Sequence, residues 1–88
     1  NATLVVGVNY PTGAISAQRT WTLPASPDVG DVVYVKSDEN VGTTASKQIV
    51  ISKAGSQVID NDLTSITLQS PNSSVGLVYV AANEWRII

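Results

Sequence analysis

The sequence predicts an all-β domain, a small antiparallel β-sandwich or barrel of seven or eight short strands. Val, Ile and Thr dominate the chain, and these residues favour strands. Gly, Pro, Asn, Asp and Ser gather at intervals of about ten residues, as they do in turns between short strands. No segment has apolar residues at the spacing of an amphipathic helix.

Alternation of apolar residues places the first two strands. One strand is expected at 4–8, where every second residue is Leu or Val, and it ends at the turn-forming segment 9–13. Another is expected at 19–23, where Trp21 and Leu23 share a face. The proline that follows removes a backbone donor and ends this strand.

The strand expected at 31–37 is apolar on both faces. Val33 and Val35 point to one side, whereas Val32 and Tyr34 point to the other. A single small sandwich would leave one of these faces partly exposed. We therefore expect this strand to be covered on both sides, with another subunit on the second side.

Five further short strands are expected in the second half of the chain. Turn-forming residues separate them. The last two are expected to form a hairpin, because Ala82-Asn83 is a tight turn between them. The expected strands are 48–52, 58–59, 65–68, 75–79 and 84–87.

The candidate core consists of large residues that share one face of these strands. Trp21 and Trp85 have the same parity as their apolar neighbours Leu23 and Ile87, so core packing is favoured over stacking on a sugar. The candidates for the core or for packing between subunits are Trp21, Val33, Val35, Ile49, Ile51, Ile66, Leu68, Leu77, Tyr79, Trp85 and Ile87.

The composition excludes several classes of site. The 88 residues include no Cys and no His, which excludes thiol catalysis, His-dependent triads and His-based or thiolate zinc sites. Five basic residues and a net charge of −2 leave no electrostatic footprint for nucleic acid. The longest apolar stretches, such as 77–80, are far shorter than the roughly 20 residues of a membrane-spanning helix, so no membrane insertion is expected.

No pair of carboxylates stands out as catalytic. Glycoside hydrolysis needs two carboxylates about 5 to 9.5 Å apart across a cleft, whereas most acids here lie in expected turns, where Asp bonds backbone amides. Asp60-Asn61-Asp62 resembles the start of a calcium loop but lacks that motif's Gly and distal Glu. We therefore expect no enzymatic activity, no metal site and no cofactor.

Several segments, taken in order, resemble a module of bacteriophage tail fibres and tailspikes. The likeness covers 18–88, although Asn61 replaces the Gly that often follows Ile-Asp in the family. Segment 1–17 is expected to be an N-terminal strand or a connection to a preceding part of a longer chain, since the sequence begins with Asn rather than Met. The segments that carry the resemblance are 21–25, 29–37, 49–51, 58–60, 65–68, 75–79 and 84–88.

The resemblance implies a small β-structured unit of a phage tail, extracellular and part of the virion, that assembles as a homotrimer. Its expected role is trimerisation and binding of a host-surface receptor such as a bacterial surface polysaccharide. Tyr10, in a turn with Pro and Gly, and Tyr34, opposite the core face, are the candidates for contact with receptor glycan. A monomeric carbohydrate-binding module and an immunoglobulin-like adhesin or spacer domain remain as alternatives.

Overall fold

The computed structural model describes residues 2–88 as a sandwich of two β-sheets. The described residues form nine strands and no helix, so the predicted all-β class is confirmed. Within this part of the chain, no helix is long and apolar enough to cross a membrane.

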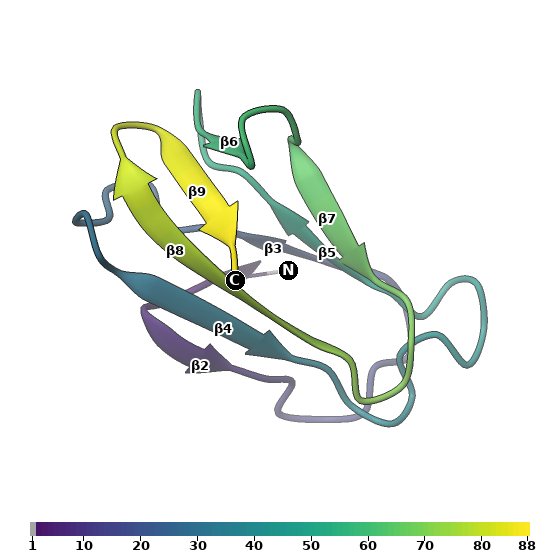
Figure 1. The fold of residues 1–88 in the computed structure, drawn as a ribbon. Helices are drawn as coiled ribbons and strands as arrows, with labels where there is room; N and C mark the ends of the chain where they lie inside the picture. The colour runs from purple at the N-terminus through teal and green to yellow at the C-terminus, as the bar shows by residue number, and fades with distance from the viewer. Residues whose placement is uncertain (1) are drawn as a thin grey trace.

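The chain changes sheet after every strand until the last two. The four-stranded sheet has the order β1 (Ala2–Thr3), β3 (Arg19–Thr22), β5 (Ile49–Ser52), β7 (Ser65–Leu68). The five-stranded sheet has the order β2 (Gly7–Asn9), β4 (Val32–Lys36), β8 (Ser74–Ala81), β9 (Glu84–Ile87), β6 (Val58–Ile59). Figure 1 shows the two layers, with β2, β4, β8 and β9 in one and β3, β5 and β7 in the other. The last two strands in the sequence, β8 and β9, form the predicted C-terminal hairpin.

Both sheets are mixed, so the prediction of an antiparallel architecture was wrong. The pairs β1–β3, β3–β5, β2–β4 and β6–β9 are parallel, and only β5–β7, β4–β8 and β8–β9 are antiparallel. A chain that crosses to the other sheet after each strand can return to the first sheet in its original direction, which a tight hairpin does not allow. Each sheet also has two free edges in its strand order, so the structure is not a closed barrel.

The segment before β3 contributes an edge strand to each sheet. The strand predicted at 4–8 was wrong in its bounds: β1 ends at Thr3 and β2 begins at Gly7. The chain crosses between the sheets from Leu4, whose side chain is buried, to Gly7. Gly7 then adopts a φ of 105°, which favours glycine. A division of the chain after residue 17 was expected from the sequence. In the structure, Leu4 and Ile15 belong to the same core as the rest of the domain.

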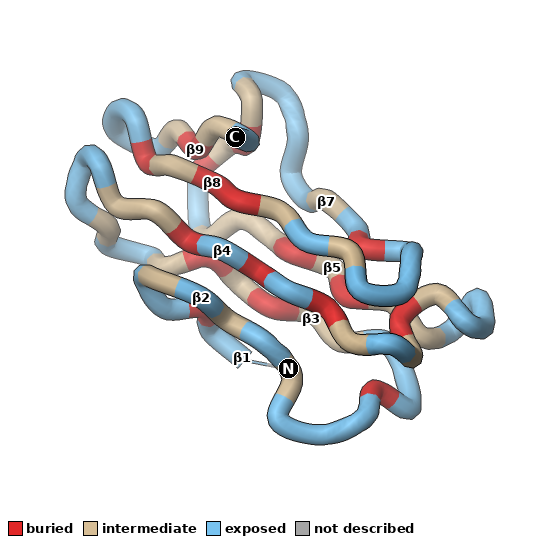
Figure 2. Tube along the Cα trace, turned by 60° about the horizontal axis from the view of Figure 1, so that its bottom comes forward, coloured by how far each residue is buried: buried red, intermediate tan, exposed pale blue. Residues whose placement is uncertain are grey.

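The core lies between the sheets, and buried residues alternate with more exposed ones along β4 (Figure 2). Among the candidates, Ile66 is half-buried and packs against the core. Ile87 is 37% exposed, although it was expected beside Trp85. The parallel strand β6 pairs only with Glu84 and Trp85 of β9, so Ile87 has no neighbouring strand on that side. The buried candidates are Trp21, Val33, Val35, Ile49, Ile51, Leu68, Leu77, Tyr79 and Trp85.

One buried polar side chain links the two sheets. Gln57 accepts a hydrogen bond from Trp85 Nε1 at 3.0 Å and from the Ala54 amide at 3.2 Å. Its own amide donates to the Pro24 carbonyl at 2.9 Å. Pro24 follows β3, whereas Trp85 lies in β9. Gln57 was not singled out from the sequence, although a buried indole N–H requires an acceptor.

Candidate functional site

The two outward faces of the sandwich differ in chemistry. Alternate residues of a strand point to opposite sides of its sheet, so the positions between the buried ones point outward. On the four-stranded sheet, the outward residues are mostly short and hydroxyl-bearing: Thr3, Thr20, Thr22, Val50, Ser52, Ser65 and Thr67. On the five-stranded sheet, six of them form what we call the apolar face: Val8, Val32, Tyr34, Gly76, Val78 and Ile88.

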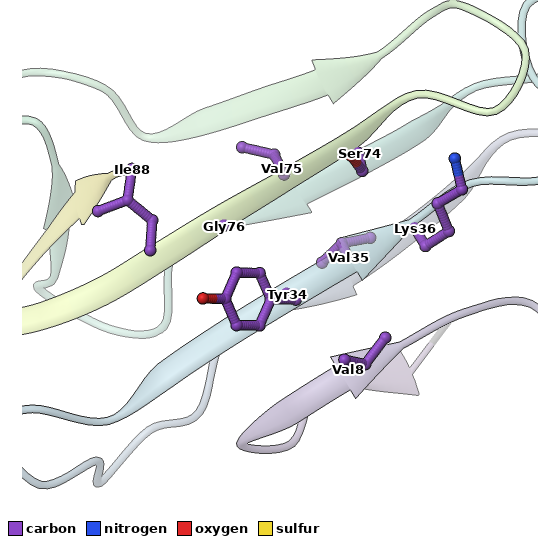
Figure 3. Close-up of a pocket in the computed structure, with 8 residues that line it drawn as sticks. All are labelled: Val8, Tyr34, Val35, Lys36, Ser74, Val75, Gly76 and Ile88. Atoms are coloured by element: carbon purple, nitrogen blue, oxygen red, sulfur yellow. The ribbon is translucent and has the colours of Figure 1, made fainter.

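Tyr34 lies at the centre of the apolar face, over Gly76. The register of β4 and β8 places these two residues opposite each other. A Cβ at Gly76 would lie 2.8 Å from the Tyr34 ring and 3.0 Å from Ile88 Cγ1, so the missing side chain leaves the room that both neighbours occupy. Figure 3 shows Tyr34 with Val8 on one side and Ile88 on the other. Part of the Tyr34 ring therefore has a packing role within the sheet.

The apolar face contains a shallow hollow of about 590 Å³. Val8 and Ile88 are each 62% exposed there, and Tyr34 is 46% exposed. The charged group that lines the hollow is Lys36, whose Nζ donates to the Asn72 carbonyl. The hollow therefore offers apolar surface, and its ammonium group already has an acceptor from its own chain.

The two tyrosines predicted to contact a receptor line different hollows. Tyr34 lines the hollow of the apolar face, whereas Tyr10 lines one of about 470 Å³ beside Trp21 and Arg19. Tyr10 is 65% exposed and lies in the connection between β2 and β3. Tyr10 also lines a smaller hollow of about 240 Å³ that includes Val8, a residue that lines the hollow at Tyr34 as well. Arg19 was not singled out from the sequence. The signal that could have found it is its place on the same face of the predicted strand as the core residues Trp21 and Leu23.

Carboxylates of the turns bind backbone amides. Asp38 accepts from three backbone N–H groups, including that of Ile15 at 3.0 Å. Asp60 accepts from the Ile87 amide at 2.9 Å, in the segment whose composition resembled a calcium loop. Residues 2–88 contain no group of three or more acidic side chains that could hold a metal ion.

No family model matches the sequence, and no curated protein matches it.

Proposed function

We propose that this chain is a non-enzymatic structural module of a bacteriophage tail fibre or tailspike. In this proposal, it assembles as a homotrimer through its apolar face and attaches the virion to a bacterial surface. The observation that supports assembly is the exposure of Val8, Tyr34 and Ile88 on one outward sheet face. The outward face of a solvated sheet is normally polar, and contiguous exposed apolar patches mark interaction sites.

The contrast with the other sheet strengthens this proposal. The same chain places Thr and Ser at the corresponding outward positions of its four-stranded sheet, so apolar outward residues are not a general property of its strands. Covering one large apolar side chain contributes about 1.5 to 3 kcal/mol, whereas association costs about 4 to 15 kcal/mol. A stable assembly must therefore cover the apolar face as a whole rather than one residue of it.

The resemblance to tail fibre modules supports the number of chains and the location. Such modules are typically homotrimers, and they lie outside the cell as part of the virion. A trimer also gives a chain of 88 residues a larger shared core than it can build alone. The two alternatives, a monomeric carbohydrate-binding module and an immunoglobulin-like adhesin or spacer domain, are both expected to be monomers. The mass in solution therefore separates them from this proposal.

Paired charge substitutions test the proposed interface. Val8→Lys places an ammonium on the apolar face, and Thr67→Lys places one at an exposed outward position of the other sheet. Both positions lie in edge strands, which tolerate Lys. By light scattering after size exclusion, the wild type and Thr67→Lys are expected at about 28 kDa, three chain masses, and Val8→Lys at one. A wild-type mass of 9.2 kDa at every concentration would contradict the proposal.

The non-enzymatic part of the proposal has its own test. Among the described residues, Asp38 and Asp60 accept hydrogen bonds from backbone amides. Glu84 forms an ion pair with the Arg86 guanidinium at 2.8 Å. None of these contacts places a base beside a nucleophile. The purified protein is expected to release no reducing ends from host surface polysaccharide. Sustained release that disappears in Asp60→Asn or Glu84→Gln would overturn this part.

A further inference from the structure

Arg19 is a half-buried cation whose side chain has no partner among residues 2–88. It is the first residue of β3 and has the same parity as Trp21 and Leu23, whose side chains are in the core. No carboxylate of the described chain lies within ion-pairing distance of its guanidinium, and no acceptor of the described chain receives a hydrogen bond from it. A half-buried guanidinium without a partner from its own chain keeps its donors free for an anion. The position therefore suits an anionic ligand.

The Arg19 side chain lines a hollow of about 470 Å³. This volume lies within the range of small-molecule sites. Trp21 forms part of the hollow from β3, and the segment from Tyr10 to Ile15 forms another part. Tyr10, which is exposed, and Thr12 border the same space. An arginine, two aromatic residues and a threonine thus line one hollow.

We propose that this hollow binds a carboxylate-bearing pyranose, such as the uronic acid units of an acidic polysaccharide. The guanidinium can bind a carboxylate through two parallel hydrogen bonds. The apolar C–H side of a sugar ring packs on an aromatic face, and Thr12 can donate to or accept from a sugar hydroxyl. The net charge of −2 disfavours a dense polyanion such as nucleic acid, whereas a single carboxylate needs only this local cation.

The acidic-sugar site shares no lining residue with the hollow at Tyr34. A smaller hollow is lined by both Tyr10 and Val8, so assembly and sugar binding are best separated with variants at Tyr34 and Arg19, neither of which lines that smaller hollow. Only the identification of the sugar's source as a host surface rests on the proposed function.

Titration of the labelled chain with D-glucuronate, followed by NMR, tests the proposal. D-glucose is the neutral control of the same ring shape, and acetate is the control for the carboxylate alone. The Arg19 Nε–H and Trp21 indole signals are expected to shift with glucuronate, while the buried Trp85 indole signal stays in place. Glucuronate is expected to bind roughly tenfold more tightly than glucose, as a charge-assisted hydrogen bond predicts.

Three substitutions separate the contributions within the site. Arg19→Gln is expected to remove the preference for glucuronate, Arg19→Lys to retain part of it, and Tyr10→Ala to weaken binding of both sugars. Lys53→Gln is the control for loss of one positive charge, because Lys53 follows β5 and bonds the Gly55 carbonyl of its own loop. This control is expected to bind both sugars as the wild type does. If Arg19→Gln fails to fold, Arg19→Lys still tests the site, because it keeps the positive charge and is expected to show a reduced preference for glucuronate over glucose.

Several results would overturn the acidic-sugar site. They are the absence of any Trp21 shift at about 50 mM glucuronate, equal shifts with acetate, or tighter binding of an acidic peptide than of glucuronate. The outcome is distinguishable from that of the assembly test. A monomer that shows the expected shifts contradicts the trimer and supports the sugar site, whereas a trimer without them does the reverse.

Discussion

At the scale of single residues, the interior of the sandwich is organised around Trp85. Its side chain is fully buried, and the Tyr79 ring meets it edge-on with centroids 5.1 Å apart. The Tyr79 hydroxyl accepts from the Asn83 amide at 2.6 Å, so the same pair supports the turn of the C-terminal hairpin. Gln57 accepts the indole proton of Trp85. These contacts join aromatic packing to a polar link between the sheets.

Gln57→Leu is expected to destabilise the fold although Leu is more apolar. The substitution removes the acceptor of the buried Trp85 indole N–H and the donor to the partly buried Pro24 carbonyl, and leaving a buried donor without a partner costs about 1 to 3 kcal/mol. Urea unfolding followed by Trp fluorescence measures this loss. Gln69→Leu, at an exposed position, is the matched control and is expected to change stability by less than about 0.5 kcal/mol. An unchanged midpoint for Gln57→Leu would contradict the role of this link.

Trp85→Ala and Tyr34→Ala are expected to have opposite effects. The first empties a fully buried site and costs about 3 to 5 kcal/mol, enough to prevent folding of a marginally stable small domain. The second removes a partly exposed ring, so its circular dichroism is expected to stay that of the intact sheet while the assembly weakens. Equal and mild effects on circular dichroism and solution mass would contradict the assignment of one side chain to the core and the other to the apolar face.

At the scale of strands and loops, the sequence predicts positions better than partners. The segments predicted at 58–59 and 65–68 are the observed β6 and β7, because alternation and turn residues are local properties. The crossing at Leu4 and the parallel pairs are not local, and a buried residue in an alternating pattern is compatible with a neighbour in either direction. The partner of Trp85 could not be located either, because Gln57 and Trp85 are far apart in sequence.

Gly42 is a loop residue whose replacement is expected to affect the packing of β4, β5 and β7. Its φ is 77°, and a Cβ there would lie 1.9 Å from the Gln69 carbonyl oxygen. Backbone would have to move, so Gly42→Ala is expected to lose about 2 kcal/mol or more of stability. Gly55→Ala is the matched control, because Gly55 also has a positive φ but open space around its Cα. It is expected to lose only about 1 kcal/mol.

Thermal unfolding of the two glycine variants provides the comparison. Gly42→Ala is expected to melt at a clearly lower temperature than Gly55→Ala. Equal melting temperatures would show that the loop after β4 relaxes without strain, and that its approach to Gln69 does not stabilise the domain.

At the scale of the whole molecule, the two sheets present different surfaces to their surroundings. One outward face carries hydroxyl groups of Thr and Ser, and the other carries the apolar face around Tyr34. The sequence indicated this asymmetry at 31–37, where both sides of the predicted strand were apolar. It could not indicate the extent of the apolar face, since Val8, Gly76 and Ile88 come from separate segments that only the fold brings together.

The measurement that most directly tests assembly through the apolar face is an isotope-filtered NOE experiment on a one-to-one mixture of labelled and unlabelled chains. Only contacts between chains give signals in such a spectrum. Assembly through the apolar face predicts signals between chains from the Tyr34 ring and the methyl groups of Val8 and Ile88, and none from the outward Thr67 methyl. Signals from Thr67 alone, or no signals between chains at any concentration, would contradict it.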